Sequence, residues 1–491
     1  MTAYLSIGAV QIQSWITRTV SRLALLRGAS IVLSERTNRN SVDAWLTANG
    51  SASRTADDAG DVDGVIVIEL HPDEVTELPA ELLQHLASRL PGVQWEAWVA
   101  EGDGYLEAFA QHAAGRDLAR FQVLPPTPEL GIVRGCGFCG AEPAMKQVQL
   151  GGDTEWAGAD CSIRLDTWRK AQRTARAGKA EVATVQDWTS IPGMWPRDFE
   201  TLAAKGGIPV GGDIQTAVGR KESRSHLALI AADGNGVGRL FETITNAHVG
   251  NLRRKAVAEL TETTREAVVE AAKEFCANPV CKVLIPHYVG GDDVLLSVPA
   301  VAAWQVASAL GRHFERLAWR LEQYLSDGEL APAGLRDVIS GVGIGIGIVF
   351  MPRSHPVADA VPVAHRALAA AKALTKGGSS AIGWMDITHG TRNEDVHAIE
   401  LSEVVADLGP GNRPDVFRLG PSARGSLAMI MQGRQDNLRG RIREWAKRTD
   451  NQANGWAEWS DVQLDALVSK LPALLSRARW WPNVSEDEED R

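Results

Sequence analysis

The tetrapeptide Gly290-Gly291-Asp292-Asp293, enclosed by two short apolar runs, constrains the fold more than any other feature of this chain. The flanking runs, residues 283–288 and 294–298, have the length and composition of buried strands. Glycines between two such runs predict a β-hairpin. The turn of this hairpin would therefore carry two adjacent carboxylates.

The elements around the hairpin predict a ferredoxin-like sheet. A buried strand ends at Asp233 and precedes a long helical region, and further helices and strands follow the hairpin. The expected order is strand 227–232, helix 239–275, the hairpin, helix 301–324, strand 339–350, helix 357–374 and strand 381–385. This is the β-α-β-β-α-β arrangement with one additional α-β step. Because its first strand lies beside the hairpin, Asp233 is expected next to Asp292 and Asp293.

Three carboxylates at one point predict a site for Mg²⁺ or Mn²⁺. Magnesium prefers oxygen ligands and keeps waters that it shares with phosphates. Two such ions can activate an attacking hydroxyl and neutralise the leaving group of an in-line displacement. Asp233, Asp292 and Asp293 are therefore the candidate catalytic and metal-binding residues.

Glycines and lysines near these acids predict a nucleotide site. Amides at a helix start can hold phosphate oxygens, and glycines in a turn accept positive φ and let a triphosphate approach the backbone. The lysines would supply positive charge to the triphosphate, although a helix C-terminus by itself also favours cations. The candidates are Gly234, Asn235, Gly236, Gly238, Gly290, Gly291, Lys372 and Lys376.

The N-terminal part of the chain predicts a second, simpler α/β unit. Apolar strand-like runs at residues 4–10 and 65–70 alternate with expected helices at 14–26 and 79–90. The proline-rich stretch at residues 125–128 is typical of a boundary.

A cysteine knuckle follows this boundary. Cys136 and Cys139 are separated by two residues, and Cys161 follows further on. Such spacing is typical of Zn²⁺ sites, which use four ligands. Gly158 stands where a fourth cysteine is expected, so the alternative is a tight turn whose metal site has decayed. Cys276 and Cys281 are interpreted as incidental.

Together these patterns predict an α+β protein with two ferredoxin-like palm domains, the first of them degenerate. A cysteine-knuckle insertion separates the palms, and a helical C-terminal domain ends in an acidic tail. The expected boundaries are residues 1–124, 125–222, 223–392 and 393–491.

Charge and hydropathy exclude some classes of function. A net charge of −10 argues against nonspecific coating of nucleic acid by the whole surface. No apolar run reaches the length of about 20 residues that spans a bilayer. The N-terminus also has no signal-peptide pattern, so a cytoplasmic protein without membrane contact is expected.

The palm motifs resemble the large subunit of type III CRISPR effector complexes. The matching stretches are ALIAADGNGVGRLF, HYVGGDDVLLSV, GVGIGIGIVF and AHRALAAAKALTKGGSSAIGW. The stretches IQSWI, residues 12–16, and LRGAS, residues 26–30, resemble the first palm of that family. The resemblance implies an antiviral enzyme that joins ATP 3′ to 5′ into cyclic oligoadenylates. Guide RNA and other effector subunits are the partners it implies.

Departures from the family pattern leave the cellular context open. The sequence contains no His-Asp dipeptide, so the His-Asp nuclease domain of many family members is not expected. Gly8 stands where the first palm of the family often has an acid, which assigns that palm a structural or ATP-positioning role. The chain is therefore either a subunit of a complex or a stand-alone enzyme, which could form a homo-oligomer and make a smaller cyclic dinucleotide.

Two alternatives remain at this point. A diguanylate-cyclase-like enzyme would use GTP on a similar palm, but its turn usually ends Glu-Phe where this chain has Asp293-Val294. A noncatalytic scaffold subunit of an RNA-guided complex would use the palms only as packing surfaces. Metal-dependent ATP binding separates this scaffold from both enzymes.

Overall fold

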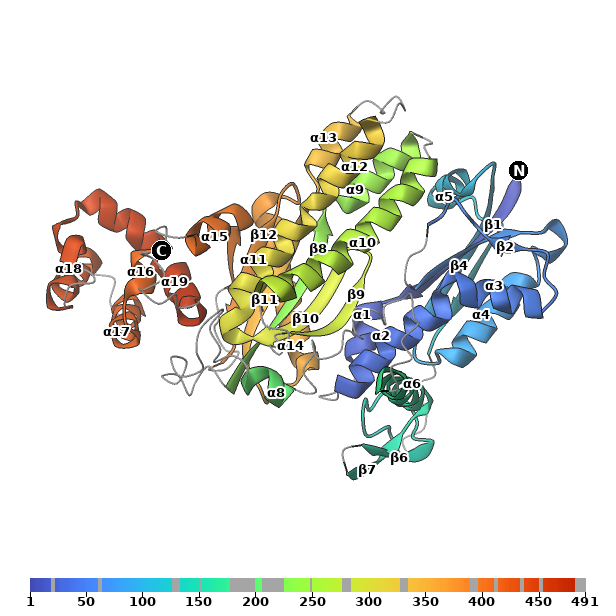
Figure 1. Ribbon diagram of the computed structural model, residues 1–491, viewed down its shortest axis with the longest axis horizontal. Helices are drawn as coiled ribbons and strands as arrows, with labels where there is room; N and C mark the ends of the chain where they lie inside the picture. Colours follow the sequence, from blue (N-terminus) through green and yellow to red (C-terminus); the bar gives the residue numbers. More distant parts are fainter. Residues whose placement is uncertain are drawn as a thin grey trace.

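Two β-sheets, a small cysteine-rich hairpin and a helical C-terminal region make up the protein (Figure 1). The computed structural model describes residues 1–18, 23–60, 64–125, 133–150, 152–176, 199–204, 225–247, 250–275, 284–326, 334–388, 396–409, 414–432, 437–449 and 454–481. The acidic tail, Cys276 and Cys281 lie outside these residues. The expected boundaries after residues 222 and 392 also lie outside them, and the expected domain division stays a prediction.

The first sheet has the ferredoxin-like order with one added strand. Its order is β2-β3-β1-β4-β5, and the central strand β1 runs antiparallel to both neighbours. The strands are β1 (Thr2–Val10), β2 (Arg54–Thr55), β3 (Val65–Leu70), β4 (Gln94–Gly102) and β5 (Ala119–Val123). The helices are α1 (Ile12–Thr17), α2 (Leu23–Thr37), α3 (Arg39–Ala48), α4 (Leu78–Arg89) and α5 (Tyr105–Ala113).

Period-2 alternation buries both faces of this sheet, because side chains of a strand point alternately to opposite sides. Leu5 and Ile7 face the main core, whereas Tyr4 joins a smaller cluster beneath α5. The helix expected over residues 14–26 is wrong. Instead α1 ends at Thr17 and α2 begins at Leu23.

The cysteine-rich insertion is a two-stranded hairpin followed by a long helix. The hairpin pairs β6 (Lys146–Leu150) with β7 (Asp153–Ala157), and α6 (Ala159–Arg176) packs on α2 of the first palm. A short helix, α8 (Phe199–Ala204), packs on β8 and β10 of the second sheet.

The second sheet has the predicted split arrangement. Its order is β13-β12-β11-β8-β10-β9, in which β11-β8-β10-β9 is the ferredoxin-like part, and β12 is the added parallel strand. The strands are β8 (His226–Asn235), β9 (Ile285–Gly290), β10 (Asp293–Pro299), β11 (Gly343–Pro352), β12 (Ala381–Asp386) and β13 (His397–Glu400).

Helices cover both faces of the second sheet. On one face they are α9 (Val237–Asn246), α10 (Gly250–Phe275), α11 (Ala303–Phe314), α12 (Arg316–Ser326) and α13 (Leu335–Ser340). The other face packs on α14 (Val357–Thr375). The strand expected from residue 339 is wrong at its start, because residues 335–340 form α13 and the strand begins at Gly343.

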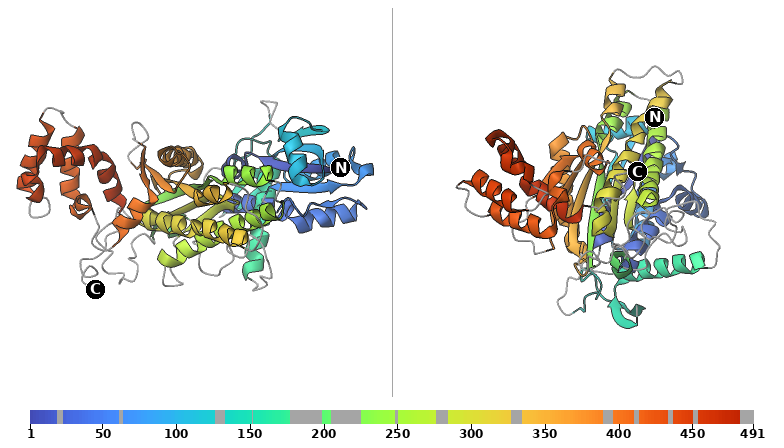
Figure 2. Two further views of the ribbon diagram at one scale, coloured as in Figure 1. Left: turned by 90° about the horizontal axis from the view of Figure 1, so that it is seen from above. Right: turned by 60° about the vertical axis from the view of Figure 1, so that its left-hand side comes forward.

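The two palms share one hydrophobic core. Leu227, Leu229 and Ala231 of β8 belong to the same buried cluster as Leu5 and Ile7 of β1. Both views of Figure 2 place the first palm directly against the second. A continuous apolar core fixes the relative position of the two domains, because separating them would expose it to water.

The C-terminal region is helical, as predicted. Its helices are α15 (Leu401–Leu408), α16 (Asp415–Arg418), α17 (Pro421–Gln432), α18 (Leu438–Arg448) and α19 (Asp461–Trp480). Aromatic contacts join it to the second palm, with Trp304 packed against Trp384 and Trp481. Among the described helices, none has the length and apolar character needed to cross a membrane.

Candidate functional site

The structure brings Asp233, Asp292 and Asp293 together at one end of the second sheet. Asp233 lies near the end of β8, and the adjacent residue Ala232 pairs with Val294 of the hairpin. A Cβ placed on Gly234 would lie 2.8 Å from Asp292 Oδ2. Glycine at position 234 therefore allows the hairpin to approach β8 closely enough for the carboxylates to meet.

These carboxylates repel one another in a partly buried place. Burial and the negative charges of Asp233 and Asp293 together raise the pKa of Asp292 to about 7. Burial and the charge of Asp233 raise the pKa of Asp293 to about 6. A bound cation is favoured at such a site, because it offsets the repulsion between partly buried carboxylates. The residues therefore fit Mg²⁺ or Mn²⁺, which prefer carboxylate oxygens.

Lys372 supplies part of the missing positive charge. It forms an ion pair with Asp233, and its Nζ lies 3.4 Å from the carbonyl oxygen of Gly234. Lys376 ends α14 in the left-handed region with φ 53° and is exposed. Of the two predicted lysines, Lys372 thus contacts the acids directly.

His365 lies on α14 before Lys372, and the charge of Asp233 acts on its imidazole. The sequence analysis did not identify this residue. Burial lowers the pKa of this imidazole, and the negative charge of Asp233 opposes the shift. His365 and Lys372 are seven residues apart on α14, which is two helical turns. That spacing is the signal that could have placed both on the face of α14 that meets the acids.

The loop after Asp233 joins β8 to α9. Gly236 is the N-cap of α9 and has φ 77°, and Gly238 lies in the first turn with open space at its Cβ position. Asn235 is buried, and its Nδ2 donates to the carbonyl of Ser379 at 2.7 Å. The side chain of Asn235 therefore fastens this loop to the segment after α14.

The two glycines of the hairpin differ in their environment. Gly291 has φ 60°, a conformation that side chains with a Cβ rarely adopt. Gly290 pairs with Asp293, and a Cβ on it would lie 2.5 Å from the hydroxyl oxygen of Tyr288. Gly291 therefore needs glycine for its backbone conformation, whereas a Cβ at position 290 would require the Tyr288 ring to move.

The first palm reaches this site through α1. The side chain of Gln13 opposes the rise in the pKa of Asp293. Sequence analysis noted the IQSWI stretch but assigned Gln13 no role. This effect acts between two domains, so no local sequence pattern could have revealed it.

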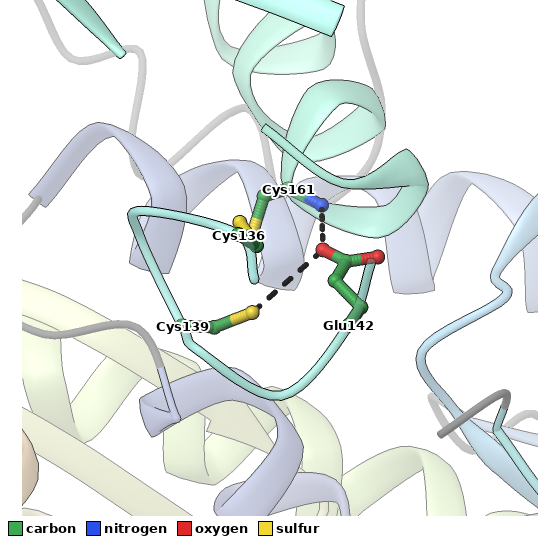
Figure 3. Close-up of side chains that lie close together, drawn as sticks. All are labelled: Cys136, Cys139, Glu142 and Cys161. Carbon is green, nitrogen blue, oxygen red and sulfur yellow. Dashed lines mark hydrogen bonds between the residues drawn. The ribbon is translucent and has the colours of Figure 1, made fainter. Parts of the chain in front are cut away.

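The knuckle gathers four side chains that could hold a metal ion. One potential ligand atom from each of Cys136, Cys139, Cys161 and Glu142 lies within 4.8 Å of every other (Figure 3). Glu142 Oε1 lies 3.7 Å from Cys139 Sγ and accepts from the Cys161 amide at 3.0 Å. Among the described residues, Glu142 is thus the candidate fourth ligand.

The fourth ligand was expected to be either missing or different from cysteine, and Glu142 is the candidate for a different one. A Cβ on Gly158 would lie 2.2 Å from Glu142 Cδ, so this glycine makes room for the glutamate. The spacing Cys136-x₂-Cys139-x₂-Glu142 is the signal in the sequence that could have identified Glu142.

The thiols are arranged so that one of them is stabilised as a thiolate. Hydrogen bonds from Cys139 and Cys161 lower the pKa of Cys136, and the amides of Gly158 and Phe138 act in the same direction. Hydrogen bonds with Cys136 and Cys139 raise the pKa of Cys161. Thiolate is the form that binds metal, so the donor set fits a thiophilic ion such as Zn²⁺.

Comparison with known proteins assigns the second palm. Residues 226–380 match the family model described as "Cas10/Cmr2, second palm domain". The chain carries a Cas10/Cmr2 palm. This confirms the resemblance inferred from the palm motifs. No curated protein matches the sequence.

Solved structures extend the likeness in fold beyond the Cas10/Cmr2 palm. An apo Csm1-Csm4 cassette matches with a TM-score of 0.54 and 12% identity, over 98% of this chain and 70% of that one. The cassette with one ATP gives 0.52 and 13%, covering 98% and 70%. The cassette with cA4 gives 0.50 and 14%, covering 98% and 69%. The α+β architecture predicted from sequence is confirmed.

Proposed function

We propose that this chain joins ATP molecules into cyclic oligoadenylate in CRISPR-type antiviral defence. The observation that carries the proposal is the meeting of Asp233, Asp292 and Asp293 on a Cas10/Cmr2 palm. Structures of similar fold contain AMPPNP, ATP, pppApA and cA3, which are substrate-like, intermediate and product molecules of this reaction.

In this mechanism the three carboxylates would hold Mg²⁺ or Mn²⁺. Ions bound there would lower the pKa of the attacking 3′-hydroxyl and neutralise charge on the phosphates. The oxygen attacks the α-phosphorus of a second ATP, the bond to the β-phosphate oxygen breaks, and pyrophosphate leaves. The attacking oxygen loses its proton to solvent, and ring closure repeats the step within the oligomer.

The other residues at the site would bind and orient the triphosphate. The first amides of α9, near Gly236 and Gly238, would favour phosphate oxygens at this helix start. Lys372 would move from Asp233 to the phosphates when a metal ion takes its place on the carboxylate. Lys376, one turn further along α14, would meet the outer phosphates.

The partners follow from the same assignment. The similar structures are cassettes of Csm1 with Csm4, which supports a role for this chain as the large subunit beside other effector subunits and guide RNA. A structural Zn²⁺ on Cys136, Cys139, Cys161 and Glu142 would complete the knuckle.

Mass spectrometry of the products tests the proposal. The purified chain, alone and with effector subunits, guide RNA and target RNA, is incubated with ATP or GTP and Mg²⁺ or Mn²⁺. Cyclic adenylates and pyrophosphate are expected with ATP, and none from the variant with both Asp292→Ala and Asp293→Ala. Cyclic guanylate would instead indicate a diguanylate-cyclase-like enzyme. Absence of product from the complete assembly would leave a noncatalytic scaffold.

A further inference from the structure

Asn235 is buried beside the acids and carries one polar atom that is left unpaired. The residue is 1% exposed, and its Nδ2 donates to the carbonyl oxygen of Ser379 at 2.7 Å. Because that carbonyl can only accept, the amide is fixed with its own oxygen on the other side. This Oδ1 is buried and has no hydrogen-bond partner among the described residues. Buried side-chain acceptors are usually paired, so an unpaired one calls for an explanation.

The strand register places Asn235 on the same face of β8 as Asp233. On the neighbouring strand β11, Gly345 pairs with Asp233 and Gly343 pairs with Asn235. Side chains two residues apart on a strand point to the same side of the sheet. On this side the sheet is covered by α14, the helix that carries Lys372. Asp233 and Asn235 therefore both face that helix.

Gly345 leaves room for Lys372 between these two acceptors. A Cβ on Gly345 would lie 2.9 Å from Lys372 Cγ and 3.3 Å from Asn235 Oδ1. The lysine stem and the unpaired oxygen thus border the same point on the sheet. From there the lysine reaches Asp233, with which it forms an ion pair. Its ammonium can donate more than one hydrogen bond, so Asn235 Oδ1 is a second acceptor within its surroundings.

The first palm has no such acceptor. Its helix α1 also follows an N-cap in the left-handed region, Gln11, just as α9 follows Gly236. Counting one residue back from each N-cap pairs Val10 with Asn235. Valine has no polar side-chain atom. Of the two palms, the amide is therefore found in the one that carries the acids.

We propose that Asn235 is a positioning residue for Lys372. When a divalent cation takes Asp233, the ammonium moves to Asn235 Oδ1 and is held there beside the triphosphate. This role rests on the proposed function, to which the cation and the triphosphate belong. The physical reason is that a half-buried ammonium that loses its carboxylate needs another acceptor, and Asn235 supplies one that is already buried and unpaired.

Mn²⁺ binding in the absence of nucleotide tests this role without any turnover. Free Mn²⁺ is measured by electron paramagnetic resonance during titration of the full-length chain. Asn235→Ala should weaken Mn²⁺ binding by about 10-fold, the size of one hydrogen bond to a charged group, because Lys372 then stays on Asp233. Wild-type affinity in Asn235→Ala would overturn the proposal.

A double-mutant cycle shows whether Asn235 acts through Lys372. Lys372→Met removes the ammonium that competes for Asp233, so this variant should bind Mn²⁺ at least as tightly as the wild type. In the Lys372→Met background, Asn235→Ala should have no further effect, since residues that act through each other give non-additive changes. A loss that persists without the lysine would overturn the proposal, and so would weaker binding by Lys372→Met alone.

Ser380→Ala is the matched control for loosening of the segment after α14. Ser380 Oγ accepts from the Ile344 amide at 3.1 Å, so its loss weakens the same segment without removing an acceptor from Lys372. Mn²⁺ affinity should equal that of the wild type, and thermal unfolding of each variant reports on the fold. A loss as large as in Asn235→Ala would assign the effect to the fastening of this segment and overturn the proposal.

A reference variant separates this inference from the proposed function. Asp292→Ala with Asp293→Ala should abolish the Mn²⁺ site, and unchanged binding in that variant would refute the metal site and the proposed function with it. If the reference variant loses binding and Asn235→Ala does not, only the positioning role fails. At saturating Mn²⁺, Asn235→Ala should raise KM for ATP and leave kcat near the wild-type value, because Lys372 would hold the triphosphate equally in the ground and transition states. A fall in kcat at unchanged KM would contradict this role.

Discussion

The two palms have the same strand order but different residues where their central strands end. Counting three residues back from each left-handed N-cap pairs Gly8 with Asp233, and the next position pairs Ala9 with Gly234. The second palm thus has an acid, and beside it a glycine that admits Asp292. The first has neither. The comparison teaches that the sheet is a scaffold and that the chemistry depends on two adjacent positions and one turn.

The hairpins of the two palms also differ, in the partners of their adjacent acids. Between β2 and β3 the first palm also has adjacent acids, but Asp57 pairs with Arg39 and Asp58 accepts from the Tyr105 amide at 2.8 Å. Arg253 of the second palm donates to the carbonyl of Ala59 in the same hairpin. Asp57 and Asp58 therefore hold elements of the first palm together, whereas Asp292 is close to Asp293 and Asp233.

The largest expected effect comes from removing the second palm's acids. Asp292→Ala with Asp293→Ala should lower cyclic oligoadenylate synthesis by at least about 10³-fold, because several kcal/mol of charge stabilisation by the metals are lost. Product formation is measured by mass spectrometry. Asp57→Ala in the first palm is the control and should leave synthesis unchanged. Loss of synthesis in both would break the distinction between the hairpins.

The pH dependence of stability should have opposite signs in the two hairpins. Asp292 has a raised pKa of about 7 in the folded protein, so its neutral form favours folding and that contribution is lost as the pH rises through 7. Asp292→Asn should therefore stabilise the metal-free protein, by on the order of 2–3 kcal/mol more at pH 8 than at pH 5. Urea unfolding at the two pH values, without divalent cations, measures the difference.

Asp57→Asn provides the comparison for that experiment. The hydrogen bond and charge of Arg39 lower the pKa of Asp57, so its charged form favours folding. Replacing it should slightly destabilise the protein at pH 8 and have less effect as the pH falls through its lowered pKa. An equal pH response of the two variants would contradict the electrostatic contrast between the palms.

The knuckle helix α6 packs on α2 of the first palm, so a Zn²⁺ ion bound by the knuckle would help to hold that palm in place. Glu142→Ala should weaken Zn²⁺ binding by about 100-fold or more, since changes to outer partners alone cost about 10–100-fold. Competition with a chromophoric chelator measures the affinity. Glu155→Ala, a change at a nearby glutamate in β7, is the control. Equal affinity in Glu142→Ala and the wild type would exclude Glu142 as a ligand.

The smallest expected effect concerns the glycine beside the acids. Gly234→Ala places a Cβ 2.8 Å from Asp292 Oδ2, which must move the hairpin and should cost about 1–3 kcal/mol of stability. Gly8→Ala adds a Cβ to the central strand of the first palm, where no atom lies within 4 Å. Urea unfolding should therefore show destabilisation only for Gly234→Ala.

Much of the fold was present in local patterns. The apolar runs and the glycine turn predicted the strands of the second palm, and the alanine-rich run predicted α14, because periodicity and turn residues act over a few neighbours. Even the strand β4 had a signal, since Trp95, Ala97 and Val99 alternate and are buried, although the sequence analysis did not name it. The failure over residues 14–26 was one of boundaries, where helical periodicity continued across the break between α1 and α2.

What the sequence by itself determined is the set of acids and the sheet that gathers them, because strand order follows from the sequence of elements and places Asp233 beside the hairpin. Only the tertiary structure decided which partners these groups have. Gln13 of the first palm acts on the pKa of Asp293 across 280 residues (293 − 13), and Glu142 lies with the three thiols where a cysteine was expected. Contacts across a domain interface depend on how two finished surfaces pack, and no periodicity within either segment encodes that.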